Sequence, residues 1–137
     1  MTKGVITITS ADAEKLRTLL REAVATDYRS SPYLAHLRGE LERARIVEPR
    51  QVDADVITMH STVELRDLES GETATWTLVF PDEADLEAGR LSVLAPIGTA
   101  MLGFRVGDAF TWDTPAGARS MRVEKVLYQP EAADHGE

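Results

Sequence analysis

The hydrophobic positions of the first 50 residues recur at helical spacing. A first apolar stripe follows a weakly alternating lead-in over residues 4–9 and consists of Ala13, Leu16, Leu19, Leu20, Ala23 and Val24. Thr9 or Ser10 can cap this helix, because a side-chain oxygen there accepts hydrogen bonds from the free N–H groups of the first turn.

A second helical stripe follows the dipeptide Ser31-Pro32, in which a capping residue precedes a proline at the first helical position. This stripe consists of Leu34, Leu37, Leu41 and Ala44, and Glu48-Pro49 is expected to end it. The pattern predicts an antiparallel helical hairpin in residues 1–50. Two helices of about 15 residues give it a length of about 22 Å at a rise of 1.5 Å per residue.

After Pro49 the pattern changes to the period of two that is typical of strands. One face of a first predicted strand carries Ile57, Met59, Ser61, Val63 and Leu65, with Thr58 and His60 on the other face. A second strand ends at Phe80, and two last strands are predicted at about residues 109–114 and 119–128. The polar tail, residues 130–137, is expected to fray.

The stretch Leu91–Asp108 predicts a strand–turn–helix corner between these strands. Pro96 ends the short strand because it has no N–H to donate. A helical turn over Ile97–Leu102 follows, and Gly103 can take the left-handed conformation that closes it. The predicted fold is therefore α+β, with a helical hairpin in residues 1–50 and a mostly antiparallel sheet carrying one short helix in residues 51–137.

Composition limits the class of protein. The chain has 137 residues, of which 43% are hydrophobic and 28% charged, as in a globular protein. No apolar run approaches the roughly 20 residues of a membrane helix, and no signal peptide is expected at the N-terminus. The absence of cysteine excludes disulfides and thiolate chemistry and agrees with a cytoplasmic location.

Charge is distributed unevenly along the chain. The net charge is −8, divided into +2 over residues 1–50 and −10 over residues 51–137. A general nucleic-acid binder would carry a basic face over its main domain, so sequence-specific nucleic-acid binding is not expected. The acidic part should instead suit a basic protein surface.

Residues with catalytic or ligating chemistry are scattered. No phosphate-binding loop, zinc-protease motif or nucleophilic triad is found, and no cofactor or metal is expected. The histidines, His36, His60 and His135, are too far apart in the sequence to suggest a site. The acidic run Asp82–Asp85 is explained most simply as a solvated loop, and Trp76 and Trp112 as core residues.

The order of residues in the corner is more specific than its composition. The run Ser92-Val-Leu-Ala-Pro-Ile-Gly98, followed by Gly103 and Gly107-Asp108, resembles the C-terminal signature of the bacterial transcript-cleavage factors GreA and GreB. Ala95 stands where Gre factors usually carry serine, and this departure is similar to the shorter Rnk branch of the family. The stretch starting at Pro81 also resembles the Gre factors, and the stretches starting at Asp55 and Leu127 resemble the Rnk branch.

This resemblance implies a protein that binds RNA polymerase. In Gre factors an FKBP-like C-terminal domain docks on the rim helices of the β′ subunit, at the mouth of the secondary channel. By motif, the resemblance makes Asp85, Ala95, Pro96 and Ile97 candidates for the docking surface. A docking role predicts a partly exposed Ile97, whereas a structural role predicts a buried one. We expect the exposed case, because Ala100, Met101 and Leu102 can anchor the helix.

The catalytic part of the Gre factors has no counterpart here. Their coiled-coil tips carry two acidic residues that hold Mg²⁺, whereas this predicted tip offers only Asp27, Tyr28 and Arg29. The resemblance therefore implies a monomeric, non-enzymatic occupant of the channel entrance that competes with Gre factors. Two alternatives stay open: an FKBP-like peptidyl-prolyl isomerase, and a modulator of nucleoside diphosphate kinase, as the name of the Rnk branch suggests.

Overall fold

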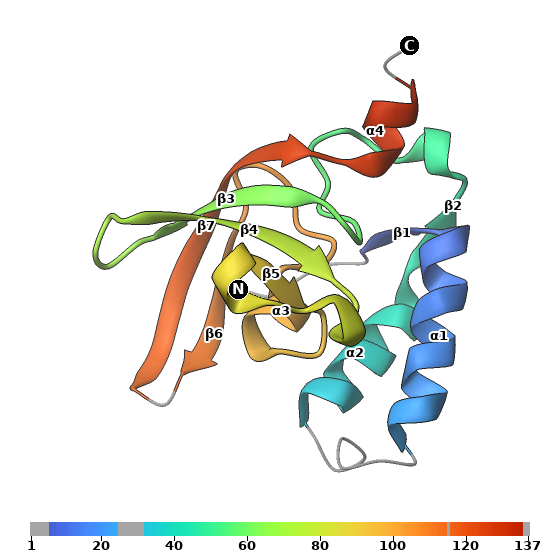
Figure 1. Cartoon of the computed structure of the whole chain (residues 1–137), viewed down its shortest axis with the longest axis horizontal. Helices are drawn as coiled ribbons and strands as arrows, with labels where there is room; N and C mark the ends of the chain where they lie inside the picture. Colours follow the sequence, from blue (N-terminus) through green and yellow to red (C-terminus); the bar gives the residue numbers. More distant parts are fainter. Residues whose placement is uncertain (1–5, 25–31, 115, 136–137) are drawn as a thin grey trace.

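The computed structural model describes residues 6–24, 32–114 and 116–135. Its N-terminal part contains helix α1 (Ser10–Val24) and helix α2 (Pro32–Arg43), which pack against each other (Figure 1). The predicted cap of α1 is confirmed, because the Asp12 N–H donates to Thr9 Oγ1 at 3.2 Å.

The second helix is shorter than predicted. α2 ends at Arg43, and the apolar residues after it form strand β2 (Arg45–Val47) instead of continuing the helix. β2 pairs in parallel with strand β1 (Thr7–Thr9), which lies directly before α1. The two paired segments are nearly 40 residues apart, and such a parallel pair produces no local sequence pattern. The helical spacing of apolar residues therefore could not predict where α2 ends.

The C-terminal part is built on a five-stranded sheet with the order β5-β4-β3-β7-β6 (Figure 1). Its strands are β3 (Thr62–Asp67), β4 (Thr73–Val79), β5 (Arg90–Ser92), β6 (Ala109–Thr114) and β7 (Gly117–Tyr128). All neighbouring strands are antiparallel except β4 and β5, which are parallel. The predicted class, α+β with a mostly antiparallel sheet, is confirmed.

The first predicted strand begins later than expected. β3 starts at Thr62, because residues 58–61 form a turn in which the Ser61 hydroxyl accepts from the Thr58 N–H at 2.9 Å. His60 within this turn has a φ of 69°, which no strand allows. Thr58, predicted on the face opposite Ile57 and Met59, is 2% exposed and therefore as buried as they are. In residues 58–61, hydrogen bonds of the Ser and Thr side chains form a turn in place of the backbone hydrogen bonds of a strand.

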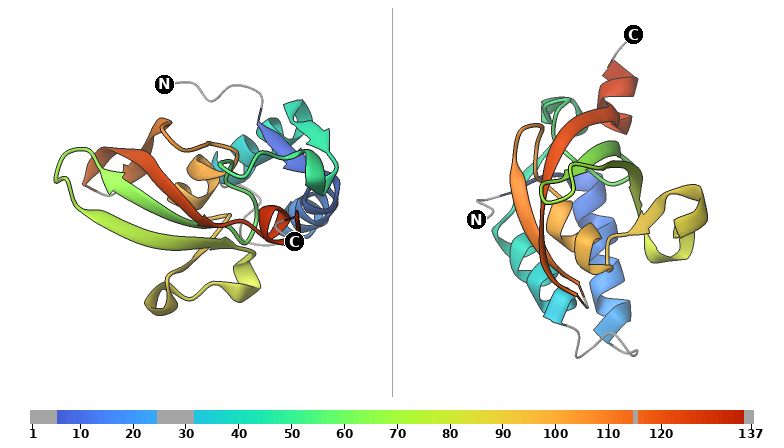
Figure 2. Two further views of the ribbon diagram at one scale, coloured as in Figure 1. Left: turned by 90° about the horizontal axis from the view of Figure 1, so that it is seen from above. Right: turned by 90° about the vertical axis from the view of Figure 1, so that its left-hand side faces the viewer.

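The core runs through both parts of the chain. Apolar side chains of the helical part, such as Leu16 and Leu37, belong to the same buried cluster as Leu65, Val93 and Phe110 from the sheet part. Figure 2 shows the two helices beside one end of the sheet. Among the described residues, no helix is both long and apolar enough to cross a membrane.

The C-terminal tail is helical over residues 130–135, whereas it was predicted to fray. Residues Pro130–His135 form helix α4, and Glu131 is 7% exposed. The Thr58 hydroxyl donates to Glu131 at 2.7 Å. The Gln129 amide donates to the carbonyls of Asp53 and Val56 at 2.8 and 2.7 Å. These polar anchors hold the start of a tail that has few apolar residues.

Candidate functional site

The corner after β5 is held together by hydrogen bonds within a short stretch. Helix α3 (Pro96–Met101) follows β5, as predicted. The Thr99 hydroxyl donates to the Val93 carbonyl at 2.6 Å, and the Leu94 N–H donates to Ser92 Oγ at 3.0 Å. Pro96 begins the helix without requiring an acceptor for a backbone N–H. Below, the α3 corner means residues 91–103.

Two glycines of the signature are required by close packing. A Cβ atom at Gly98 would lie 2.0 Å from the Ser92 carbonyl oxygen, a distance that no side chain tolerates. Gly103 has a φ of +85°, as predicted for the end of the helix, and a Cβ there would lie 2.5 Å from the Ile6 side chain. The glycines therefore let α3 lie directly on β5 and on the N-terminal segment.

The four candidate docking residues differ in accessibility. The Asp85 side chain is 47% exposed, and Ala95 and Pro96 are half-buried. Ile97 is only 7% exposed, so the expectation of a partly exposed side chain was wrong. It belongs to the buried core cluster, because α3 packs against β6. No hydrogen bond or ion pair between described residues joins Asp85 to Ala95 or Pro96.

The acidic loop, residues 81–90, lies between β4 and β5 and contains the 3₁₀ turns η3 (Pro81–Glu83) and η4 (Leu86–Ala88). Asp85 is the N-cap of η4, and its Oδ1 accepts from the Ala88 N–H at 3.4 Å. The backbones of Asp85 and Arg90 exchange two hydrogen bonds of 2.9 Å. Their side chains form an ion pair at 3.6 Å. The loop is therefore closed at its base.

The start of the acidic loop is attached to the turn that contains His60. Glu83 Oε1 lies 2.8 Å from His60 Nε2 and accepts the Phe80 N–H at 3.2 Å. The hydrogen bond from His60 holds the pKa of the Glu83 carboxyl below its usual value. The His60 ring also contacts Phe80, with 5.7 Å between ring centroids. His60 thus has a local structural role.

The exposure of Leu86 was not predicted from the sequence. This side chain is 67% exposed, the largest fraction among the exposed large hydrophobic residues described. Its neighbours Ala84 and Ala88 are also exposed. Only the tertiary arrangement of the loop could show this, because a leucine in a short acidic stretch gives no periodic pattern.

A cavity of about 430 Å³ lies over one end of the sheet, where the turns of the β3–β4 and β6–β7 hairpins are found. We call these two turns the hairpin ends. The apolar lining of the cavity comprises Leu65, Trp76, Ile97, Trp112 and Met121. Phe104 and Phe110 stack on each other within the core, 5.3 Å apart, and are not part of the lining. The interpretation of the two tryptophans as core residues is therefore incomplete: both are half-buried and pack on the core, but both also face this cavity.

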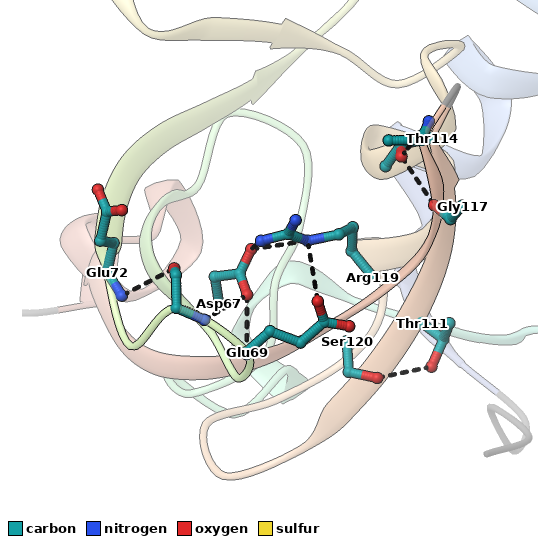
Figure 3. Close-up of polar contacts among 10 residues, drawn as sticks. Asp67, Glu69, Glu72, Thr111, Thr114, Gly117, Arg119 and Ser120 are labelled. Atoms are coloured by element: carbon teal, nitrogen blue, oxygen red, sulfur yellow. Dashed lines mark hydrogen bonds and ion pairs between the residues drawn. The ribbon is translucent and has the colours of Figure 1, made fainter.

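The polar lining of this cavity also comes from the two hairpin ends, and Figure 3 shows the contacts of Asp67, Glu72, Thr114 and Arg119 among it. Arg119 on β7 donates through Nε to Asp67 Oδ2 at 3.0 Å, and Glu69 Oε2 lies 3.9 Å from the same nitrogen. The hydrogen bond from Arg119 holds the pKa of Asp67 below its usual value. Thr111 and Ser120 pair at 3.3 Å on the outer part of β6 and β7.

A buried acidic group lies where α1 meets the sheet part. Asp12 is 9% exposed, and its Oδ2 accepts the Met59 N–H at 3.3 Å. Burial, with a smaller contribution from the nearby Glu131 carboxylate, raises the pKa of Asp12 to about 6. No group of three or more His, Asp or Glu side chains that could hold a metal ion is found in the described part of the chain.

The predicted tip residues Asp27, Tyr28 and Arg29 lie outside the described residues. His36 forms an ion-pair contact with Glu40 at 3.0 Å along α2, far in sequence from His60. A further groove, of about 880 Å³, lies between α1 and the start of the acidic loop, and its lining includes Lys15, Leu19, Phe80 and Asp82.

Two family models match the chain, and together they cover most of it. The model for the C-terminal part of the transcription elongation factors GreA/GreB matches residues 51–128. The model for the Rnk N-terminus matches residues 5–47.

Full-length relatives agree with these matches. The regulator of nucleoside diphosphate kinase from Escherichia coli K12 is 40% identical over 97% of this chain and 96% of its own length. The transcription elongation factor GreA from Ralstonia nicotianae is 36% identical over 69% of this chain, and the match spans 61% of the GreA chain.

Solved structures show the same relationship. A prokaryotic transcription elongation factor GreA/GreB from Nitrosomonas europaea superposes with a TM-score of 0.78 and 38% identity, over 90% of this chain and 99% of that chain. The GreA factor homolog Gfh1 of Thermus thermophilus gives a TM-score of 0.50 and 29% identity, over 91% and 100% of the two chains. This chain belongs to the GreA/GreB transcription elongation factor family and, within it, to the Rnk branch.

Proposed function

We propose that this protein is a non-catalytic transcription regulator that binds RNA polymerase at the entrance of the secondary channel and competes there with Gre factors. The observation that carries the proposal is the match of residues 51–128 to the C-terminal part of GreA/GreB. We interpret residues 51–137 as an FKBP-like docking domain and residues 1–50 as a short coiled-coil hairpin. Such a regulator acts in the cytoplasm.

The charge distribution supports this partner. Residues 51–137 carry a balance of −10, and the acidic loop holds four of these carboxylates within six residues. A surface of this charge favours encounter with a basic protein surface, such as the β′ rim helices that the resemblance implies. We therefore expect polymerase binding to weaken as salt concentration rises.

The docking surface that we propose includes the acidic loop and the start of α3. Asp85, Ala95 and Pro96 are accessible from the solvent side. The side chain of Ile97 is buried and also lines the cavity at the hairpin ends. Its contribution to docking is then to the shape of the corner, without direct contact.

The absence of catalysis in this proposal rests on the tip sequence. Residues 25–31 contain one acidic residue, Asp27, beside Arg29. Holding Mg²⁺ requires several oxygen ligands placed together. We therefore expect no stimulation of transcript cleavage in backtracked complexes at saturating protein, and Mg²⁺-dependent cleavage that is lost in Asp27→Ala would contradict this.

The direct test is a pull-down of core RNA polymerase with the full-length protein, followed by competition with a Gre factor. Retention of the polymerase, and its release by the Gre factor at increasing concentration, are the expected results. Retention without competition would place the binding site elsewhere on the polymerase. No retention at low salt would contradict the proposal.

The cavity at the hairpin ends favours a second candidate function, peptidyl-prolyl isomerase activity. Trp76 and Trp112 both line it, and apolar aromatic walls suit a proline ring. Turnover of a proline-containing peptide, lost in Trp112→Ala and retained in Thr111→Ala on the same strand, would support this function. Purified nucleoside diphosphate kinase assayed with and without the protein tests the remaining alternative.

A further inference from the structure

Leu86 is an apolar side chain held out from an acidic surface. It is 67% exposed, and the loop that carries it also contains Asp82, Glu83, Asp85 and Glu87, all of them exposed. In Figure 2 the loop, coloured yellow, projects away from the sheet. Its first residues, Pro81–Glu83, line a groove with α1, and Leu86 is not part of that lining. A single exposed leucine is common on protein surfaces, so its position matters only if the loop fixes it there.

The loop does fix the position of Leu86. Two backbone hydrogen bonds of 2.9 Å between Asp85 and Arg90 close the loop immediately before and after the η4 turn. Gly89 ends η4 in the left-handed conformation, with a φ of 76°, and its carbonyl accepts the Thr77 N–H from β4 at 2.7 Å. A short turn that is closed on itself and tied to a central strand keeps its exposed side chain in one place before a partner arrives.

Asp85 is engaged within the loop. Its Oδ1 caps η4 by accepting the Ala88 N–H at 3.4 Å, and its Oδ2 lies 3.6 Å from the Arg90 guanidinium. A direct contact with a partner would have to compete with both interactions. The carboxylate is therefore better placed to shape the loop than to serve as the contact itself.

We propose that Leu86 is the apolar contact residue of the docking surface, that it enters an apolar hollow on a basic surface of RNA polymerase, and that Asp85 is a positioning residue that presents it. This inference rests on the proposed function. It names Leu86 as the residue that makes the contact, and it changes the role of Asp85 from contact residue to positioning residue.

The chemistry of the partner follows from what surrounds Leu86. Asp82 and Glu87 have no ion-pair partner among the described residues, so their charges are available to basic groups around the hollow. An interface with an apolar centre and a charged rim of this kind places most of its binding energy in the central residue, because the rim excludes water from it. The acidic rim then contributes to association rate and orientation.

The test compares Leu86→Ser with Leu68→Ser in binding to core RNA polymerase. Leu68 is a matched control, because it is also an exposed leucine, 43% exposed, in a turn of the same sheet part. We expect Leu86→Ser to weaken binding about tenfold or more and Leu68→Ser to leave it unchanged, with the same melting temperature for both variants and the wild type. Equal binding by Leu86→Ser and wild type would overturn the inference.

The positioning role of Asp85 has its own readout. Asp85→Asn removes the charge but keeps a side-chain oxygen that can cap η4, whereas Asp85→Ala removes both. We expect Asn to retain binding within about threefold and Ala to weaken it about as much as Leu86→Ser. Equal loss in Asn and Ala would make the charge itself the contact and overturn the positioning role.

These outcomes separate the inference from the proposed function. If wild-type protein does not bind the polymerase, the proposed function fails and Leu86 loses its assigned partner with it. If wild-type protein binds, is released by a Gre factor and is indifferent to Leu86→Ser, the proposed function stands and only the inference fails.

Discussion

The α3 corner and the acidic loop adjoin each other in the chain, and both contain residues that the sequence indicates for contact with RNA polymerase. Their physical character is opposite. In the corner, Ile97, Gly98, Thr99 and Met101 are buried, whereas every residue from Asp82 to Ala88 is exposed. The corner has no ionisable side chain between Leu91 and Phe104, and the loop has five within ten residues.

This difference shows what the family signature in the corner encodes. Its glycine and hydroxyl positions are explained by packing, since Gly98 leaves room for the Ser92 carbonyl and Thr99 satisfies the Val93 carbonyl. A motif that identifies a family can therefore report a structural requirement. The residues that meet a partner can lie beside it, in a stretch of weaker pattern.

The largest expected effect is that of Gly98→Ala in the corner. The added Cβ would lie 2.0 Å from the Ser92 carbonyl oxygen and 3.0 Å from its carbon, both backbone atoms that cannot turn aside. We expect a loss of about 3 kcal/mol or more in the free energy of unfolding, measured by urea denaturation. Gly71→Ala is the control in a turn, because nothing lies within 4 Å of its Cβ position, although its φ of +77° carries a smaller cost.

A small change for Gly98→Ala would mean that β5 and α3 can move apart. The corner would then be less tightly packed than the structure indicates, and it would differ less from the exposed acidic loop.

Ile97→Ala is expected to have the next largest effect. Because Ile97 is 7% exposed and lines both the core and the cavity, removing its side chain should cost about 2–5 kcal/mol in the free energy of unfolding. Polymerase binding measured well below the melting temperature should change little. A stable Ile97→Ala protein with binding weakened more than tenfold would return this residue to the contact surface.

Ile97 also shows where prediction from the sequence stops. The helical turn predicted over Ile97–Leu102 is observed as Pro96–Met101, and the turn at Gly103 and the strand 109–114 also agree with prediction. Each has a local cause in proline, glycine or alternating side chains. The direction in which Ile97 points depends on how α3 lies on β6, and no local pattern records that packing.

The other differences have similar causes. The parallel strand pairs β1–β2 and β4–β5 join segments without a hairpin between them, so the sequence carries no turn signal for them. The start of helix α4 is attached to the rest of the chain by the hydrogen bond from Thr58 to Glu131, two residues that are 73 positions apart. Within the candidate site, Asp85 and Pro96 were identified by motif, whereas Leu86 was found only from its exposure.

Asp12 combines properties of both regions, because it is buried like the corner and ionisable like the loop. Its pKa is raised from 3.8 to about 6 in the folded protein, so folding favours the protonated form. The contribution of Asp12 to stability is therefore greatest below about pH 4 and falls as the pH rises through 6. The expected difference is about 2–3 kcal/mol.

Asp12→Asn tests this assignment. The amide keeps an oxygen for the Met59 N–H but does not titrate, so the variant should lose the fall in stability between pH 4 and 6. Glu14→Gln on the exposed face of the same helix is the control and should keep the wild-type profile. The measurement is the free energy of unfolding across this pH range; an unchanged profile in Asp12→Asn would assign the effect to another group.

The smallest expected effect is the opening of the acidic loop by acid while the α3 corner stays closed. Glu83 holds the start of the acidic loop by accepting the Phe80 N–H, and the hydrogen bond from His60 lowers its pKa. A carboxyl with a lowered pKa stabilises the folded state at neutral pH and loses that contribution as the pH falls through its folded value, below the usual value of about 4.3. Acid should therefore open the loop before it affects the corner.

Amide hydrogen exchange measures this difference, because it reports the protection of single N–H groups. The two groups to compare are the Phe80 N–H and the Thr99 N–H, which donates to the Ala95 carbonyl at 2.9 Å. We expect Phe80 protection to fall with acid while Thr99 protection holds, and Glu83→Gln to remove the dependence. A parallel fall at both amides would show that the loop and the corner open together.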